Sequence, residues 1–569
     1  MPNLLSVEFD VPATMRDGTV LRANVFRPAG GGLYPVALCR TPYNKDFATV
    51  QGFLDAPRLA RAGYIVVIQD VRGRAASEGA WSPLAHEYED GYDTVEWAAR
   101  LPGSSGAVGM FGISYLGFTQ WAAALAGPPS LRAIVPGLTW ARANGGLTFR
   151  GGAFELGTAA AWQLGAVAID AIFRRMRNAP PQEVARALAD LAREIDALRT
   201  SGYGELPLAE FGPLRRVGVG TEFLEYVARG AAPDSFSPFP SPEAYARVTV
   251  PSLNIGGWYD LFIQGTIDNF LGTRAHGATP EARHSRLLIG PWSHVNYGGT
   301  VGEQDFGFAA QAAFMKLETD VTGLTQRWFD YWLKGIDNGV ASEPPVRVFV
   351  LGQNAWRDMD GWPPQSTQTP FYLRASGGLV PEPPGDEPPD AYVYDPTDPT
   401  PTRGGPLLMH PLFVPGAADQ RPIEARPDVL SYTSAPLDRD LEVAGRVSAR
   451  LWAASDAPDT DFVARLVDVH PDGFAQFLAD GIVRARAALG APLEPGRPYE
   501  LVVDMWSVAN VFRAGHRVRL DICSASFPRW DRTLNTLAST PTLADARPAR
   551  QTIFHDAARP SCVLLPVRE

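Results

Sequence analysis

Short apolar runs alternate with segments of helical spacing over the first 140 residues. Strand-like runs occupy residues 34–39, 64–69, 108–113 and 132–136, and a helical pattern fills 88–100 between the second and the third. Strands that alternate with helices are typical of a parallel sheet. The pattern therefore predicts an α/β fold for this part of the chain.

The strand signal disappears between residues 143 and 246, where Ala-rich helical spacing takes over, as in 182–199. Strand-like runs return at 248–255 and 286–290, and a helical pattern follows at 315–333. We therefore predict that the α/β domain has two parts, residues 1–142 and 247–354, with a mostly helical insertion at residues 143–246.

Beyond about residue 355 the pattern changes again. Pro and Gly crowd residues 362–427, and segments with a period of two follow at 441–453, 461–469 and 518–522. Alternation between turn residues predicts an all-β sandwich over residues 355–569. The Pro-rich stretch 382–405 is interpreted as a connector.

Composition narrows the class of partner. The 51 basic and 62 acidic residues of the 569 give a net charge of −11, and no Lys/Arg cluster follows a stripe, so we expect no nucleic-acid partner. The three cysteines form no CxxC pair, which argues against a disulfide framework and a thiolate metal site. No Sec-type leader is visible, and Gly, Ser and Pro interrupt the uncharged stretch 101–131. We expect a cytoplasmic protein with no membrane span.

A serine lies where one strand-like run meets a helical one. Residues 112–117 read GISYLG, one residue longer than the usual G-x-S-x-G, and the helical pattern 115–126 begins directly after the serine. Small residues on both sides allow so sharp a turn, which would raise the Ser114 hydroxyl above the sheet. The other interpretation is a glycine-rich turn with a capping serine.

A serine nucleophile needs a histidine base and a carboxylate that orients the histidine. Asp260 and His294 end the next two strand-like runs, in the order Ser, acid, His that α/β-hydrolases use. Asp268 is the alternative acid. Because no H-x-x-x-H, H-E-x-x-H or Cys/His pattern occurs, we expect neither a metal nor a cofactor.

Several segments resemble the cocaine esterase and X-Pro dipeptidyl-peptidase family of serine hydrolases over nearly the whole chain. They are RTPYNK (40–45), QDVRGR (69–74), SEG (77–79), GMFGISYLG (109–117), GWYD (257–260), GPWSH (290–294) and SASFPRWDR (524–532). The resemblance implies an α/β-hydrolase domain, an inserted helical cap and a C-terminal β jelly roll.

The resemblance also implies roles for individual residues. Ser114, Asp260 and His294 would form the triad, and the Tyr43 hydroxyl with the Tyr115 backbone N–H would form the oxyanion hole. Trp162 and Phe262 resemble positions that contact the acyl group, with Trp258 and Trp292 as further candidates. Asp70 and Arg72 are interpreted as a structural ion pair.

The substrate is expected to be a small ester with an apolar or aromatic acyl group. Phe262 and Ile263 follow Asp260 where relatives that act on amino-acid esters carry part of an acidic cluster, and an apolar side chain cannot pair with an ammonium group. The alternatives are amide (β-lactam side-chain) acylase activity, an X-Pro dipeptidyl-peptidase using Glu155, and a non-enzymatic binding module. The oligomeric state is open, with a homodimer among the options.

Overall fold

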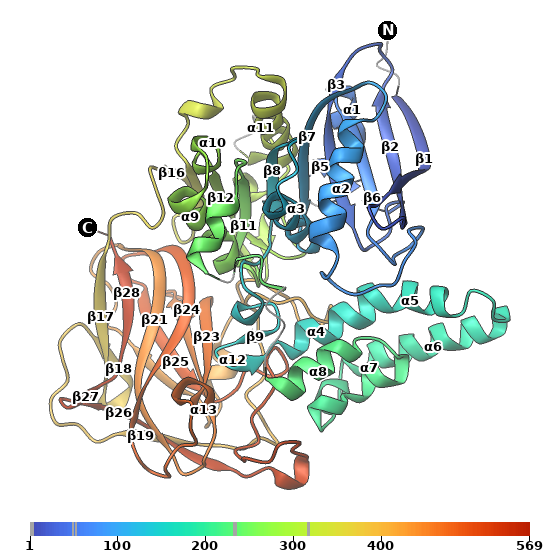
Figure 1. Cartoon of the computed structure of the whole chain (residues 1–569). Coiled ribbons are helices and arrows are strands. Elements are labelled where there is room, and N and C mark those ends of the chain that lie inside the picture. Colours follow the sequence, from blue (N-terminus) through green and yellow to red (C-terminus); the bar gives the residue numbers. More distant parts are fainter. Residues whose placement is uncertain are drawn as a thin grey trace.

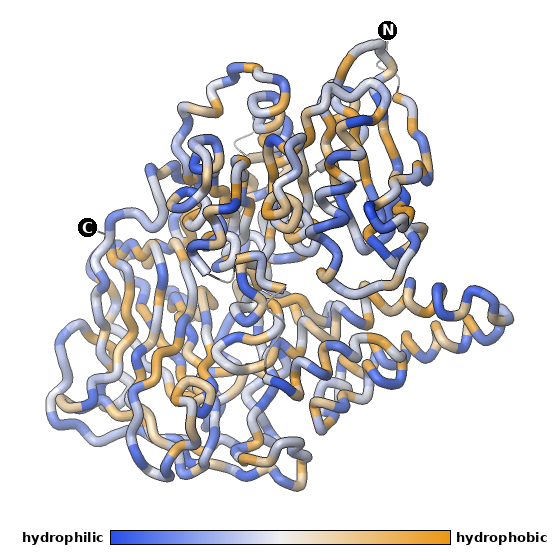
Figure 2. Tube along the Cα trace, viewed as in Figure 1, coloured by the Kyte–Doolittle hydropathy of each residue, from blue (hydrophilic) through white to orange (hydrophobic). Residues whose placement is uncertain are grey.

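The computed structural model describes residues 5–47, 50–51, 54–230, 236–239, 241–315 and 319–568. Figure 1 shows three parts: an α/β domain, an arm of helices that extends to one side, and a β-rich domain beneath the α/β domain. Figure 2 shows hydrophobic positions along the central strands of both sheets. The three cysteines are buried and unpaired, which confirms that disulfides do not staple this fold.

A ten-stranded sheet forms the centre of the α/β domain. Its order is β1-β2-β6-β3-β7-β8-β11-β12-β15-β16, and every pair from β6 to β15 is parallel. The strands are β1 (Leu5–Thr14), β2 (Val20–Pro28), β3 (Tyr34–Thr41), β6 (Ile65–Asp70), β7 (Ser104–Ile113), β8 (Leu131–Gly137), β11 (Leu253–Tyr259), β12 (Arg286–Ser293), β15 (Val346–Val350) and β16 (Ala355–Met359). The parallel strands are apolar over nearly their whole length because both faces are covered.

Two details differ from the expected boundaries. The run 248–255 is strand only from Leu253, because Pro251 lacks the N–H that a sheet ladder uses. β16 pairs antiparallel with β15, so the α/β sheet continues past residue 354, where we placed the start of the β region. The ten-stranded sheet therefore extends to Met359.

Helices flank this sheet, and two pairs of short strands lie in its connecting loops. They are α1 (Ala56–Arg61), α2 (Glu87–Ala99), α3 (Tyr115–Ala126), α9 (Ile263–His276), α10 (Pro280–Arg283) and α11 (Val321–Lys334), with the pairs β4 (Val50–Gln51) and β5 (Leu54–Asp55), and β13 (Thr300–Val301) and β14 (Gln304–Asp305). The helical run expected at 315–333 crosses residues 316–318, which lie outside the described residues; its described part is α11.

The inserted region is mostly helical, as its Ala-rich spacing predicts. After a hairpin of β9 (Phe149–Arg150) and β10 (Ala153–Phe154) come α4 (Leu156–Trp162), the π-helix η2 (Gln163–Val167), α5 (Ala168–Arg175), α6 (Pro181–Ala197), α7 (Gly212–Val217) and α8 (Thr221–Arg229). Within the described residues one stretch, Leu156–Arg175, is long and apolar enough to span a membrane, but 56% of its window is buried inside the protein. It is therefore weak evidence for a membrane span.

The C-terminal region is β-rich. Its strands are β17 (Thr367–Arg374), β18 (Gly378–Val380), β19 (Asp390–Tyr394), β20 (Leu430–Thr433), β21 (Leu441–Ser455), β22 (Asp461–Val469), β23 (Ala475–Arg484), β24 (Tyr499–Phe512), β25 (Arg517–Cys523), β26 (Ala549–Asp556), β27 (Arg559–Pro560) and β28 (Cys562–Val567), with the short helices α12 (Arg421–Glu424) and α13 (Ala485–Leu489). The expected connector 382–405 contains β19, which pairs with β26 because Tyr392 and Tyr394 turn into the core.

The β-rich domain packs directly on the α/β sheet. One apolar cluster contains Tyr259 of β11, Val348 of β15, and Leu451 and Val503 of the β-rich domain. A second cluster joins the α/β domain to the helical arm. The carboxyl ends of the central strands thus lie where all three parts meet.

Candidate active site

Ser114 occupies a strained turn between β7 and α3. Its backbone has φ 60° and ψ −123°, a conformation that L-residues rarely adopt. Two glycines make the turn possible: a Cβ at Gly112 would lie 2.6 Å from the Leu116 Cβ, and one at Gly117 would lie 2.7 Å from the Thr139 Cβ. Thr139 also donates a 3.0 Å hydrogen bond to the Ser114 carbonyl. This geometry is that of a nucleophile elbow.

His294 and Asp260 lie together at the carboxyl ends of neighbouring parallel strands, β12 and β11. The His294 Nδ1 is 2.6 Å from the Asp260 Oδ2, and the other carboxylate oxygen accepts a 2.8 Å bond from the Phe262 N–H. Asp260 is fully buried and His294 is 6% exposed. With Nδ1 held by the carboxylate, Nε2 is the nitrogen left to exchange protons.

Tyr43 follows the carboxyl end of β3 and turns its hydroxyl toward the elbow. The Trp162 indole donates a 3.0 Å hydrogen bond to this oxygen. Burial raises the pKa of Tyr43 to about 12, against smaller lowering effects of hydrogen bonds from Trp162 and Ser114. The phenol therefore stays protonated at neutral pH. Its oxygen accepts the hydrogen bond from the Trp162 indole, so its own O–H can donate to another acceptor.

Tyr115 is the first residue of α3, so its backbone N–H has no acceptor inside the helix. Its side chain takes no part in this: the Tyr115 hydroxyl donates to Glu87 at 2.8 Å and accepts from the Leu84 N–H at 3.0 Å. Glu87 in turn pairs with Arg40 at 2.5 Å. This buried network fixes the start of the helix.

A pocket opens onto Ser114 and is lined by uncharged side chains. Trp162 and Phe262, which were predicted to contact the acyl group, line it, and so do Tyr43 and Tyr115, which were predicted to form the oxyanion hole; none of these contacts tests a catalytic role. The other lining residues are Pro83, Leu84, Trp140, Leu147, Thr158, Ala159, Phe223, Phe236 and Leu408. The walls come from the α/β domain, the helical arm and, through Leu408, the β-rich domain.

Sequence reasoning missed several of these residues. Trp140 comes shortly after β8, at the same sheet edge as the elbow, and its position after a strand was an available signal. Phe223, Phe236 and Leu408 come from distant segments, and nothing in their local pattern marks them. Trp258 and Trp292, named as pocket candidates, belong elsewhere: their indoles donate to the carbonyls of Phe349 and Ala310, and neither lines the pocket.

Two acidic candidates are engaged elsewhere. Glu155 accepts a 2.8 Å bond from the Trp530 indole and lies against Arg529, so it is buried between the arm and the β-rich domain. Asp268 accepts from Gln264 on the same helix.

Asp70 and Arg72 are structural, but they do not pair with each other. Asp70 receives the Lys45 backbone N–H at 2.7 Å, whereas Arg72 binds Asp17 and Asp90, each at 2.6 Å. The expected ion pair is therefore wrong in its partners, because Arg72 extends away from the strand end.

Arg74, within the segment QDVRGR, links the Tyr43 loop to the arm. Its guanidinium donates to the Pro42 carbonyl at 2.9 Å and to the carbonyls of Val167 and Ala166, each at 3.2 Å. Those two carbonyls belong to the π-helix η2, which follows Trp162 directly. Arg74 is 2% exposed, and it connects the residue before Tyr43 to the helix that follows Trp162.

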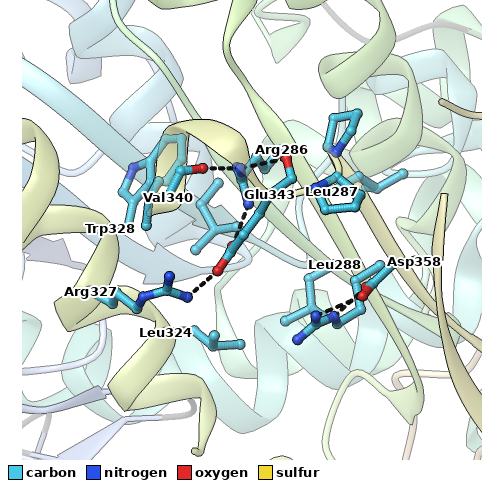
Figure 3. Close-up of a pocket in the computed structure, with 13 residues that line it drawn as sticks. Arg286, Leu287, Leu288, Leu324, Arg327, Trp328, Val340, Glu343 and Asp358 are labelled. Carbon is cyan, nitrogen blue, oxygen red and sulfur yellow. Dashed lines mark hydrogen bonds and ion pairs between the residues drawn. The ribbon is translucent and has the colours of Figure 1, made fainter. Parts of the chain in front are cut away.

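A second pocket, drawn in Figure 3, is of a different kind. It lies at the amino-terminal edge of the sheet, where β12, β15 and α11 meet, and its charged groups pair with one another: Glu343 binds Arg286 at 2.6 Å and also Arg327, and Asp358 binds Arg347. Ligands of parallel sheets bind at the carboxyl edge. The pocket at Ser114 is therefore the candidate active site.

Comparisons with known proteins agree with this architecture. Residues 17–296 match the family model of X-Pro dipeptidyl-peptidase (S15 family), and residues 338–564 match the X-Pro dipeptidyl-peptidase C-terminal non-catalytic domain. Cocaine esterase of Rhodococcus sp. (strain MB1 Bresler) is 37% identical, over 99% of this chain and 98% of that protein.

Two solved structures cover the whole fold. An aminopeptidase from a marine sediment Thaumarchaeota archaeon has a TM-score of 0.79 at 25% identity, over 99% of this chain and 96% of that one. An α-amino acid ester hydrolase has a TM-score of 0.78 at 24% identity, over 100% and 97%. The fold and these matches define the chain as a serine hydrolase with an α/β-hydrolase domain. It belongs to the family of cocaine esterase and the S15 X-Pro dipeptidyl-peptidases.

Proposed function

We propose that this protein hydrolyses carboxylic esters with apolar or aromatic acyl groups, through Ser114, His294 and Asp260. The observation that carries the proposal is the uncharged, largely aromatic pocket that opens onto Ser114. Apolar walls favour an apolar acyl group, and they leave any charged group of the acyl part without a partner.

The proposed reaction is acyl transfer from the ester to water in two steps. His294 Nε2 takes the Ser114 proton while Oγ attacks the ester carbonyl, and the resulting oxyanion accepts hydrogen bonds from the Tyr43 hydroxyl and the Tyr115 N–H. The C–O bond between the carbonyl carbon and the alcohol then breaks, and the protonated His294 gives its proton to the departing oxygen. The alcohol leaves, and the acyl group remains bonded to Ser114 Oγ as the acyl-enzyme. Water attacks this acyl-enzyme with His294 as the base, and the carboxylic acid departs as Ser114 regains its proton.

Asp260 orients the imidazole and stabilises its charged form. Its second oxygen is held by the Phe262 N–H, so the carboxylate cannot rotate away from Nδ1. The Phe262 ring also packs edge-on against His294, with the ring centroids 5.5 Å apart. Phe262 therefore both supports the acid and forms a wall of the acyl pocket.

Release of X-Pro dipeptides is the second candidate function, because the S15 family model covers the catalytic region. That activity requires an acidic partner for the substrate ammonium. No lining residue of the pocket carries a charge, and Glu155 is occupied by Trp530 and Arg529. The same observation disfavours acylase activity on acyl groups that carry a charge.

The test is hydrolysis of a benzoyl ester, a short aryl acetate and an X-Pro anilide by the purified protein. We expect ester turnover that is abolished in Ser114→Ala, with no turnover of the anilide. Anilide turnover that depends on Ser114 would replace the esterase by the peptidase. Ester turnover that survives Ser114→Ala would overturn the proposed nucleophile.

A further inference from the structure

Two histidines and one aspartate gather on one face of the β-rich domain, away from Ser114. Asp468 and His470 are two residues apart at the end of β22, so their side chains point to the same face. Asp468 pairs with Val518 and Val469 with Arg517 in the antiparallel ladder with β25. Continuing that register by one residue puts His516 opposite His470.

The three side chains lie close enough to share one ion. One ligand atom from each of Asp468, His470 and His516 lies within 4.8 Å of the other two. The two imidazole centroids are 4.5 Å apart. The His516 Nδ1 is 2.8 Å from an Asp468 oxygen, and the Asp468 side chain is 1% exposed against 14% for His516. The cluster is therefore buried at its carboxylate and open at its histidines.

Neighbouring amides orient these groups. Gln476 lies directly opposite Asp468 on β23, and its Oε1 is 3.2 Å from the His470 Nε2. The Gln476 amide nitrogen donates to the Tyr259 hydroxyl at 3.4 Å, and Asn510 donates to the second Asp468 oxygen at 3.5 Å. Metal-binding histidines and carboxylates usually carry such outer hydrogen bonds, which fix the tautomer and the direction of the lone pair.

We propose that Asp468, His470 and His516 bind a divalent transition-metal ion of the Zn²⁺ type. Two imidazoles and one carboxylate are a common three-ligand set for Zn²⁺, with a fourth position for water. The nitrogen donors disfavour Mg²⁺ and Ca²⁺, which prefer all-oxygen shells. The ligands come from two different hairpins, so no contiguous metal motif is visible in the sequence.

The site lies at the seam between two domains. Gln476 connects it to Tyr259, the residue directly before Asp260 in β11. A bound ion would cross-link the β22–β23 and β24–β25 hairpins next to this contact, and binding to the folded state alone raises stability. The proposal does not depend on the proposed esterase activity, because its readout is metal binding.

The experiment is a titration of the full-length protein, freed of metal by a chelator that is then removed, with ZnCl₂ in competition with a chromogenic zinc chelator. We expect one Zn²⁺ per chain, and a rise in the melting temperature when Zn²⁺ is added. His470→Ala and His516→Ala should lose this equivalent, and Gln476→Ala should bind about 10–100-fold more weakly. His276→Ala, which removes an exposed histidine on α9, should bind as the wild type does.

A second measurement needs no variant. Co²⁺ added to the metal-free wild type should give visible absorption bands of a low-coordinate site, and one equivalent of Zn²⁺ should abolish them. Circular dichroism checks that each variant is folded. The proposal is overturned if the wild type takes up no stoichiometric equivalent, or if folded His470→Ala and His516→Ala still take it up.

Discussion

Two aspartate–histidine pairs in this chain use the same atoms in different surroundings. His294 Nδ1 contacts Asp260 at 2.6 Å, and His516 Nδ1 contacts Asp468 at 2.8 Å. The first pair lies beside an elbow serine and an uncharged pocket, whereas the second faces another imidazole and an amide. Asp260 orients its imidazole, whereas Asp468 is itself a proposed ligand of the ion, so the groups around each pair set the chemistry open to it.

The largest effect is expected from removing the nucleophile. Ser114→Ala should lower kcat for an aryl ester by on the order of 10⁶-fold, the scale seen when the serine of a triad is deleted. Labelling with a fluorophosphonate should be lost in parallel. If the variant were still labelled, the nucleophile would be another residue. The Asp260–His294 pair would then no longer differ from the Asp468–His516 pair by serving a nucleophile.

The next effect tests the aspartate of the first pair. Asp260→Asn should lower kcat by about 10⁴-fold, because the amide favours the wrong tautomer of His294. The matched control is Asp390→Asn, which alters another aspartate in contact with a histidine, His555, at 3.0 Å in the β-rich domain. We expect this control to keep its turnover. Equal losses in both variants would show that general destabilisation, not tautomer control, is being measured.

Tyr43→Phe should lower kcat by about 10²–10³-fold, the cost of losing one oxyanion donor. KM should change little, because the donor acts on the charge that develops in the transition state. Trp162→Phe is the companion variant, since it removes the indole N–H that donates to Tyr43 while an aromatic ring remains in the pocket wall. If Tyr43→Phe were as active as the wild type, the phenol would have no place in the oxyanion hole.

Arg74→Gln should lower kcat by about 10²-fold or less, because it releases the Pro42 carbonyl and lets Tyr43 move relative to Ser114. Arg72→Gln is the control: Arg72 lies two residues away, but its guanidinium binds the carboxylates of Asp17 and Asp90 and no carbonyl of the Tyr43 loop. A thermal melt of both variants separates positioning from stability. Equal kcat values in the two variants at equal stability would contradict the role given to Arg74.

The smallest expected effect concerns the pH dependence of kcat, which should show no decline on the alkaline side up to pH 10. Burial raises the pKa of Tyr43 to about 12, so the phenol should keep its proton well above pH 10, where an ordinary tyrosine is half ionised. The same shift means that Tyr43 costs stability only as the pH rises from about 10 through 12, because the folded state then holds a proton that the unfolded state has lost. The kcat should therefore stay level from pH 8 to 10. A decline centred near pH 10 that disappears in Tyr43→Phe would contradict this.

Much of the fold was predictable because its signals are local. Ser114, Asp260 and His294 each follow an apolar strand, and a parallel sheet brings such strand ends to one edge. Leu408, Arg74 and the His470–His516 contact were not predictable in this way. Each depends on segments that lie tens to hundreds of residues apart, and their side chains are ordinary in their own surroundings. Asp70 and Arg72 show the same limit, since adjacency in sequence suggested a pair that the turn separates.

The pocket at Ser114 has one consequence for how such enzymes diversify. Its walls are contributed by three regions of the chain, and only one of them carries Ser114 and His294. Recombination that exchanges the segment around Leu408, or the helical arm, would alter the range of acyl groups while the hydrolytic machinery is inherited intact. The substrate range can thus change by exchange of these segments, while every intermediate protein keeps its catalytic residues.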